Sequence, residues 1–193
     1  MKRFLSRAVI FAAAAILSPA LASAQEVSQE RIINGLGKLT SAAPTIDLEI
    51  LRQEAISGGD KPMSALPNWK RIAKLPQMVV EINFENDSVA ILPSSYRTLG
   101  LLADALHHPN LWDYKFLVVG HASSTGDDKY NLDLSEKRAA AIKEALSTTF
   151  AVDPQRLYAV GVGEYMPIPG TDSTGSNNRR VQLINLGVFK KKS

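Results

Sequence analysis

The chain has 193 residues, of which 45% are hydrophobic and 21% are charged, and it contains no cysteine. That length accommodates one ordinary core with an appendage, and the absence of cysteine excludes disulfides, thiol catalysis, cysteine-ligated metal and a lipid on a cysteine. Three basic residues among the first seven account for the formal net charge of +3, so the remainder is formally neutral and gives no reason to expect a nucleic-acid partner.

We expect residues 1–24 to be a secretory signal peptide. A basic start precedes an uncharged and mostly apolar run over 8–24, which ends in the small residues Ala-Ser-Ala that a signal peptidase requires. The run is shorter than the roughly 20 apolar residues that span a bilayer, and Pro19 interrupts it. The mature protein is therefore expected to begin at Gln25 in the periplasm, with no retained transmembrane segment.

Residues 25–76 form an N-terminal extension to which the sequence assigns no function. A helical pattern covers 26–36, residues 40–44 have loop composition, and the alternating Ile-Asp-Leu-Glu-Ile of 46–50 predicts a strand. Two interpretations stay open, a segment that packs on the main domain and a partly ordered spacer. The extension is also the part of the chain through which we would expect another envelope protein to bind.

From residue 77 onward, the spacing of apolar residues predicts a regular series of strands and helices. The strands are expected over 78–84, 114–120, 156–162 and 179–185, and the helices over 93–106 and 131–146. This β-α-β-α-β-β order over 77–186 predicts an α+β two-layer sandwich, in which two helices cover one face of a mixed four-stranded sheet. Polar positions in the first strand predict that the other face is solvated, and residues 187–193 would form a basic C-terminal tail.

The second of these helices carries an arginine in an apolar stripe. Leu134, Arg138, Ile142 and Leu146 recur every four residues and therefore share one helix face. A guanidinium in that position needs an anion or a set of acceptors, because an unpaired buried charge is costly. Since Arg179 alternates with the apolar residues of the last predicted strand, the two arginines suggest one anion site.

The residues alone favour a plainer reading of these arginines. Arg138 and Arg179 could pair with Asp127, Asp128 or Asp133 and only brace the fold.

Three segments resemble motifs of the OmpA-like C-terminal domain. NLDLSEKRAAAI at 131–142 resembles the family's Asn-x-x-Leu-Ser-x-x-Arg-Ala signature, and VDPQRLYAVGVGEYMP at 152–167 resembles its Arg-Leu and Gly-x-Gly-Glu-x-x-Pro segment. NNRRV at 177–181 resembles its Asn-Arg-Arg-Val. The resemblance covers about 77–185 and implies an OmpA-like domain of the outer membrane or cell wall that binds the peptide stem of peptidoglycan non-covalently, gripping diaminopimelate.

The resemblance also implies which residues bind the wall peptide. Arg138 matches the arginine that pairs with the diaminopimelate carboxylate, and Ser123, Asn131, Asn178 and Arg179 complete the expected peptidoglycan-binding set.

One position departs from the family's pattern. The loop after the second strand usually has Gly-His-Thr-Asp, with the aspartate facing the ligand's ammonium, whereas residues 120–123 here are Gly-His-Ala-Ser. A neutral hydroxyl in place of a carboxylate should lower affinity about tenfold. Either Asp127 or Asp128 supplies the missing charge, or binding is weak, or the domain has become a structural or protein-interaction module that no longer binds the wall.

Other chemistries lack the spacing that they require. His121 with Ser123 or Ser124 and Asp127 has no Gly-x-Ser-x-Gly elbow and no evident oxyanion hole, so we expect no enzyme. The adjacent pair at 107–108 lacks zinc-ligand spacing, and we therefore expect neither a metal nor a cofactor.

Overall fold

The computed structural model describes residues 27–37 and 39–189, so the expected signal peptide and most of the basic tail lie outside the described residues. Its sheet has the strand order β1-β4-β2-β3, in which β2 and β3 are parallel and the other two pairs are antiparallel. The strands are β1 (Gln77–Val80), β2 (Tyr114–Gly120), β3 (Leu157–Gly161) and β4 (Val181–Val188). The helices are α1 (Gln29–Leu36), α2 (Leu48–Gly58), α3 (Trp69–Ile72), α4 (Tyr96–His107) and α5 (Asp128–Thr148), with 3-10 turns η1 (Met63–Ala65), η2 (Pro93–Ser95), η3 (Pro154–Arg156) and η4 (Ser176–Asn178).

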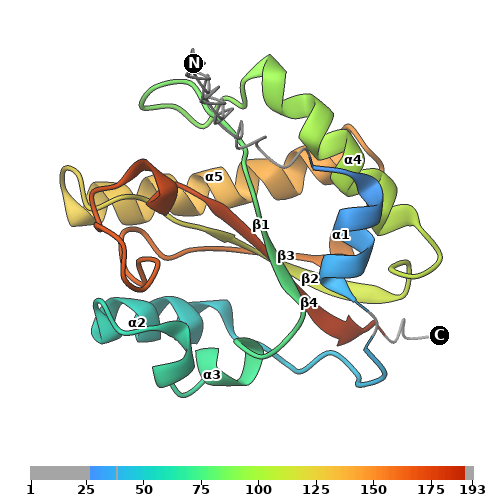
Figure 1. The fold of residues 1–193 in the computed structure, drawn as a ribbon, viewed down its shortest axis with the longest axis horizontal. Helices are drawn as coiled ribbons and strands as arrows, with labels where there is room; N and C mark the ends of the chain where they lie inside the picture. Colours follow the sequence, from blue (N-terminus) through green and yellow to red (C-terminus); the bar gives the residue numbers. More distant parts are fainter. Residues whose placement is uncertain (1–26, 38, 190–193) are drawn as a thin grey trace, which may run out of the picture.

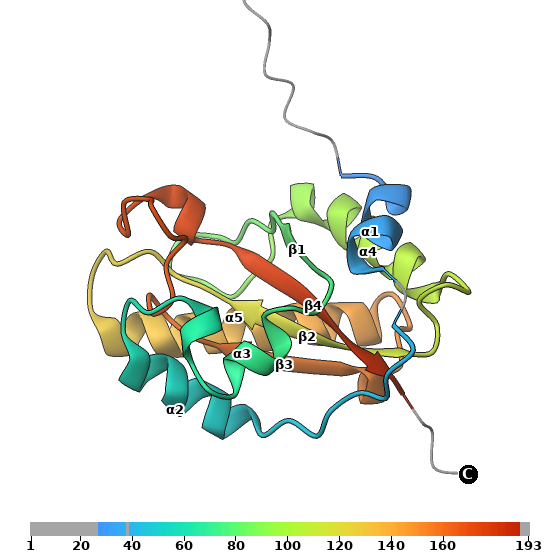
Figure 2. The same cartoon turned by 60° about the horizontal axis from the view of Figure 1, so that its bottom comes forward.

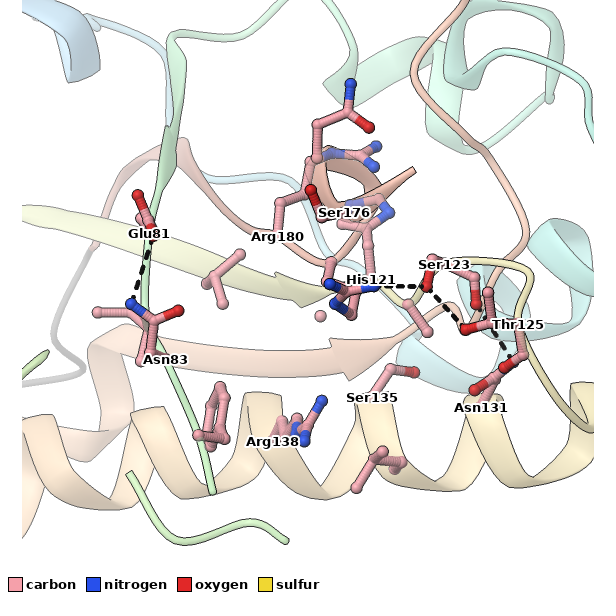
Figure 3. A pocket seen from close by; sticks show the side chains of 18 of the residues that line it. Glu81, Asn83, His121, Ser123, Thr125, Asn131, Ser135, Arg138, Ser176 and Arg180 are labelled. Atoms are coloured by element: carbon pink, nitrogen blue, oxygen red, sulfur yellow. Dashed lines mark hydrogen bonds between the residues drawn. The ribbon is translucent and has the colours of Figure 1, made fainter. Parts of the chain in front are cut away.

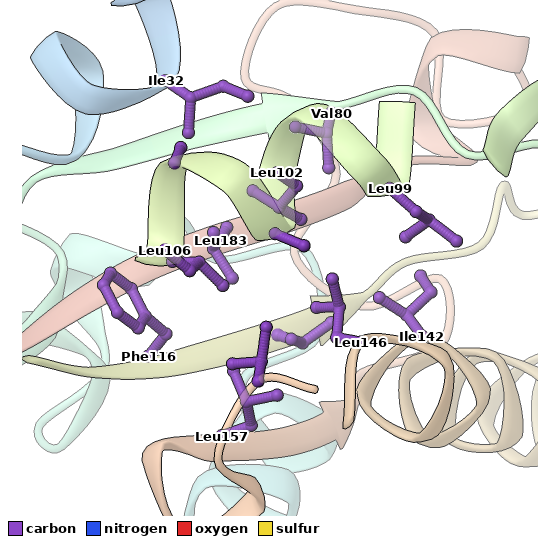
Figure 4. Packing of buried hydrophobic residues seen from close by; sticks show 14 of the residues in the cluster. Ile32, Val80, Leu99, Leu102, Leu106, Phe116, Ile142, Leu146, Leu157 and Leu183 are labelled. Atoms are coloured by element: carbon purple, nitrogen blue, oxygen red, sulfur yellow. The ribbon is translucent and has the colours of Figure 1, made fainter. Parts of the chain in front are cut away.

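The predicted β-α-β-α-β-β order and the mixed four-stranded sheet are confirmed. Helices α4 and α5 cover one face of the sheet, and α1 lies beside α4 on that side (Figure 1). Alternate strand residues such as Phe116, Val118 and Leu183 point into this layer, where they are buried against both helices (Figure 4). Leu102 of α4 and Ile142 of α5 meet them there, so this layer is the larger core of the protein.

The opposite face of the sheet is covered, and the expectation that it is solvated was wrong. Leu117, Val119 and Ile184 point to this side and are buried under α2 and α3, which supply Leu51 and Trp69 (Figure 2). The indole Nε1 of Trp69 donates to the Leu51 carbonyl at 2.8 Å, so the two helices are joined beneath the sheet. Helices α2 and α3 therefore pack on the domain as a third layer, whereas α1 belongs to the layer of α4 and α5.

The strand expected over 46–50 was also wrong, because this stretch starts α2. The Asp47 carboxylate accepts hydrogen bonds from the main-chain N–H groups of Glu49 and Ile50, which caps the helix. Leu51 and Ala55 follow four residues apart and are buried together against the sheet. The short alternation of 46–50 is outweighed by a capping residue and a helical apolar spacing that begins just after it.

Two strand-end glycines allow α5 to lie directly against the sheet. A Cβ atom on Gly120 would lie 2.3 Å from the Ser135 carbonyl oxygen, and one on Gly161 would lie 2.1 Å from the Glu136 nitrogen. The Gly163 N–H, just beyond β3, donates to Ser135 Oγ at 2.8 Å, which fixes the helix at the same point. The middle of α5 is thereby held at the carboxyl ends of β2 and β3.

We predict that Gly161→Ala lowers the free energy of unfolding by about 3 kcal/mol or more, because the clash is with helix main chain that cannot rotate away. Gly100→Ala is the matched control, since its added methyl would meet only Phe150 at 3.5 Å and α4 should gain about 1 kcal/mol. Urea unfolding of both variants checks this prediction. Equal stability of the two would contradict the close packing of α5.

Trp69→Ala should lower the free energy of unfolding by about 3–5 kcal/mol, because the indole is fully buried between α2 and the sheet. Trp112→Ala should cost about 1 kcal/mol or less, because that side chain is 56% exposed. Unfolding followed by two spectroscopic probes should show one transition in each variant. A small loss at Trp69, or a separate early transition, would mean that the third layer is only loosely attached.

Candidate functional site

A large pocket opens where β1 and β4 separate. These strands pair from Gln77 with Ile184 as far as Val80 with Val181, and beyond that point Asn83 bonds instead to Ser95. The separation leaves a pocket of about 930 Å³ between the chain that follows β1, the end of β2, the loop after it, α5 and the start of β4 (Figure 3). The pocket therefore lies at the carboxyl end of β2, where α5 is held by the strand-end glycines.

Arg138 projects from α5 into this pocket (Figure 3). Its Nε donates to the Ser88 carbonyl at 3.0 Å and its Nη2 to the Glu85 carbonyl at 3.4 Å, and its guanidinium lies 4.8 Å from the centre of the Phe84 ring. Among the residues that the structure describes, none receives a hydrogen bond from Nη1. The arginine in the apolar stripe is thus held by carbonyls and a ring, with one nitrogen left for a ligand.

Burial lowers the pKa of the Arg138 guanidinium, while Tyr130 and Asp87 oppose that shift and nearby Arg179 adds to it. Arg156 shows what a bracing arginine looks like in this fold. It is 4% exposed, and it donates to the carbonyls of residues 106, 111 and 114 at 2.7–3.1 Å. Arg138 differs because it faces a cavity and keeps unused donor capacity.

Arg179 and Ser123 meet in the lining of the pocket. The Arg179 Nη1 donates to the Ser123 hydroxyl at 3.2 Å, and the same hydroxyl lies 3.1 Å from Thr125 Oγ1. Arg179 stands just before β4, which starts at Val181, rather than within a strand as predicted. It lines the pocket all the same, so the structure brings both predicted arginines to one cavity.

The two predicted asparagines lie in different places. Asn131 lines the pocket and donates to the carbonyls of Ser123 and Thr125 and to the Glu164 carboxylate, at 2.7–3.3 Å. Asn178 is 1% exposed and does not line the pocket. Its side chain bonds to the main chain at Ile168 and within 172–173, so it holds the loop that presents Arg179.

None of the aspartates considered from sequence enters the pocket. Asp127 caps α5 by accepting from the Tyr130 N–H, Asp128 follows it at the helix start, and Asp133 pairs with Lys137 at 2.6 Å on the exposed face. The interpretation that these carboxylates pair with Arg138 and Arg179 is therefore wrong. Arg138 is fixed by main-chain carbonyls instead.

The acidic residues that do line the pocket come from the segment after β1, and sequence reasoning missed them. They are Glu81, Glu85 and Asp87. Asp87 has a left-handed backbone with φ of 49° in a turn closed by the Ser88 N–H and the Glu85 carbonyl, and Tyr130 Oη donates to its carboxylate at 3.4 Å. The Glu-Asn-Asp-Ser composition of 85–88 is a turn signal, but nothing local indicates that the turn faces α5.

His121 is a buried neutral histidine whose tautomer is fixed by a chain of amides. The Ala73 carbonyl can only accept a hydrogen bond, so the Gln77 amide donates to it through Nε2. Gln77 Oε1 then accepts from Gln182 Nε2. Gln182 therefore presents its Oε1 to His121, and His121 Nε2 must carry the proton that is donated to it. Nδ1 is then unprotonated, and it is buried without a hydrogen-bond partner among the residues that the structure describes. Burial lowers the pKa of His121 to about 3, with the charge of Arg180 adding to the shift and the Gln182 bond opposing it.

The hydrolytic set considered from sequence is not assembled. His121 bonds to Gln182, Ser123 to Arg179, and Ser124 to Ser173 at 2.7 Å. In the described part of the chain, no group of three or more histidine, cysteine or acidic side chains is arranged to hold a metal ion.

The chain is similar to proteins of the bacterial envelope. A family model described as the OmpA family matches residues 83–181. Outer membrane protein A of Bordetella avium is 29% identical over 192 residues, which are 95% of this chain and 96% of that protein. Outer membrane porin F of Pseudomonas aeruginosa is 32% identical over 114 residues, and the peptidoglycan-associated lipoprotein of Agrobacterium fabrum is 35% identical over 106 residues. The names of these three relatives describe outer-membrane or wall-associated proteins, and none of the names describes an enzyme.

The shared region is a small part of some relatives. It covers 58% of this chain and 32% of the porin, and 53% of this chain and 58% of the Agrobacterium lipoprotein. Among solved structures, the peptidoglycan-associated lipoprotein of Burkholderia pseudomallei is 28% identical, with a TM-score of 0.45 over 56% of this chain and 88% of that one. Of the helices that the structure describes, none is long and apolar enough to cross a membrane.

The His121 environment predicts a dependence of stability on pH. The pKa of His121 is 6.5 in the unfolded chain and about 3 in the native state, so between these pH values only the unfolded chain binds the proton. The free energy of unfolding is therefore highest above pH 6.5 and decreases as the pH falls below that value. We expect a loss of about 2 kcal/mol between pH 7 and pH 5. His121→Asn removes this proton and should flatten the dependence, as measured by urea unfolding at each pH. Equal slopes in the two proteins would contradict the buried neutral histidine.

Proposed function

Because this chain belongs to the OmpA family, we propose that it binds the peptide stem of peptidoglycan non-covalently through the Arg138 pocket. The observation that carries the proposal is the unused donor of Arg138. A guanidinium that lines a cavity, is half-buried and fixed by two carbonyls, and makes no Nη1 hydrogen bond to the described residues is prepared to bind a carboxylate without further ordering.

The ligand that we propose is the diaminopimelate of the stem peptide. Its carboxylate would bind Arg138, with Arg179 close enough to share the negative charge. Ser123 and Asn131 would contact the neighbouring polar groups, because both line the same end of the pocket. Asn178 would act only by holding the loop of Arg179 in place.

Two relatives support a wall ligand by their names. One is the Agrobacterium lipoprotein described above, and the other is the peptidoglycan-binding protein ArfA of Mycobacterium tuberculosis, which is 30% identical over 105 residues. Those 105 residues are 53% of this chain and 31% of ArfA. We propose that this chain acts in the periplasm, at the wall or the outer membrane, which agrees with the signal-peptide pattern of its first 24 residues.

The proposal predicts that the mature chain, residues 25–193, sediments with purified insoluble peptidoglycan. Arg138→Ala should abolish sedimentation, and it should lower the free energy of unfolding by only about 1–2 kcal/mol, because it removes two hydrogen bonds and a ring contact. Soluble muropeptides released from the same wall should displace the unmodified protein.

Two variants serve as controls for this experiment. Lys137→Ala removes a neighbouring charge on the exposed face of α5 and should leave sedimentation unchanged. Arg156→Ala should unfold the protein far more readily than Arg138→Ala does, because it orphans three buried carbonyls. Full sedimentation of Arg138→Ala, or none by the folded unmodified protein, would favour an interaction module over a wall-binding protein.

A further inference from the structure

A second pocket lies in the third layer, between α3, the start of α2 and the chain that leads into α2. Its volume is about 180 Å³, and it shares no lining residue with the Arg138 pocket. The family model starts at residue 83, so this third-layer pocket is built wholly from the N-terminal extension. Any role of the third-layer pocket is therefore separate from the proposed wall binding.

The interior of the third-layer pocket is apolar. Leu51 and Ile72 line it and are 2% and 1% exposed, whereas Ile50 lines it and is 50% exposed. Ile46 lines it as well and packs against the core beneath the sheet. An apolar cavity of about 150 Å³ holds one benzene ring, and pockets for small-molecule ligands measure about 300–1,000 Å³. The third-layer pocket is therefore suited to one bulky side chain of a partner.

One wall of this pocket offers main-chain groups that are not paired. The chain before it follows β4, where Ala42 forms a parallel bridge with Val188 and the Ala43 N–H donates to the Val188 carbonyl at 3.0 Å. The chain then leaves the sheet, and no described residue forms a hydrogen bond with the main chain of Thr45 or Ile46. An extended peptide pairs with such groups through its own main chain.

The α3 wall of the pocket is cationic. Arg71 lines the pocket, and Lys70 and Lys74 lie close to it in the sequence. All three residues are exposed, and none of them forms an ion pair with a residue that the structure describes. These unpaired cations favour a partner that carries carboxylates.

The carboxylates of the third layer lie at other positions. Asp47 lines the pocket and stays anionic, but its Oδ1 accepts from two main-chain N–H groups at the start of α2, where the helix dipole offsets its charge. Glu54 accepts from the main chain of Asn68 and Trp69 at 2.9–3.1 Å and does not line the pocket. Glu49 does not line it either. A partner's carboxylates are therefore expected on the α3 side.

We propose that the third-layer pocket binds an extended segment of another protein, in which one bulky apolar side chain enters the pocket and neighbouring acidic side chains lie against α3. Burial of the apolar side chain supplies most of the affinity, and the cations select acidic partners. The Arg138 pocket lies beside α5, and α2 and α3 cover the opposite face of the sheet, so both pockets can be occupied at once.

Three fluorescein-labelled peptides test the inference with the mature protein. The first is Ser-Glu-Glu-Leu-Glu-Glu-Ser, the second has serine in place of the leucine, and the third has lysine in place of each glutamate. We expect the first to bind about tenfold more tightly than either of the others in fluorescence anisotropy, because the second lacks the buried side chain and the third reverses the charge. Equal binding of the three, or no binding by the folded protein, would overturn the inference.

Two charge reversals locate the binding site. Arg71→Glu should weaken binding of the acidic leucine peptide about tenfold and strengthen binding of the lysine peptide. Lys61→Glu is the matched control, because it makes the same change at an exposed residue of the extension that does not line the pocket. An equal loss in the two variants would indicate unspecific attraction between charges and would overturn the inference. Ile50→Glu changes a half-exposed residue at which folding is tolerant, and it should also weaken binding of the acidic leucine peptide.

Other occupants of the pocket give different results, each of which would overturn the inference. Displacement of the acidic leucine peptide by soluble muropeptides would place it in the Arg138 pocket. Self-association that Ile50→Glu abolishes, measured by analytical ultracentrifugation, would identify a second copy of the chain as the occupant. Binding to phosphatidylglycerol vesicles that Arg71→Glu abolishes, without binding to the peptide, would identify a lipid. Sedimentation with the wall tests the proposed function separately from all of these measurements.

Discussion

The contact between the main chain of α5 and the glycines at the ends of β2 and β3 determines how the site is built. Any side chain at Gly120 or Gly161 would occupy the position of helix backbone atoms, so the helix lies as close to the sheet as main chains permit. That contact fixes the height and rotation of α5, and with them the positions of Asn131 and Arg138. The separation of β1 from β4 then leaves the space into which Arg138 points.

The two arginine environments show how one residue type serves either the fold or a ligand. Arg156 donates its hydrogen bonds to three carbonyls inside the protein. Burial lowers the pKa of this arginine and also makes it inaccessible to a ligand. Arg138 lies over an aromatic ring and donates to two carbonyls, it lines the pocket, and its Nη1 makes no hydrogen bond to the residues that the structure describes. A charge at this core-facing helix position is thus tolerated because carbonyl acceptors replace part of its hydration and the pocket keeps the guanidinium from full burial.

The sequence predicted β2 with its observed bounds, because an apolar run between polar turns has few alternatives. The sequence also contained a signal that both faces of the sheet are covered, because residues 116–119 are continuously apolar rather than alternating. The prediction of a solvated face did not take this signal into account. The first turn of α2 was mistaken for a strand because the capping role of Asp47 is visible only with the helix that follows it. Asp87 and Tyr130 could not be paired in advance, because their contact joins segments 43 residues apart through the packing of α5.

The central claim, that the Arg138 pocket receives the anionic group of a wall peptide, is tested most directly by nuclear magnetic resonance of the labelled mature protein during titration with a soluble stem peptide. The account predicts that the Nε–H resonance of Arg138 and the amide resonances of Ser123 and Arg179 shift together and saturate with one affinity. Resonances of α2 and α3, on the far face of the sheet, should stay in place. Shifts confined to α2 and α3, with Arg138 unmoved, would contradict it.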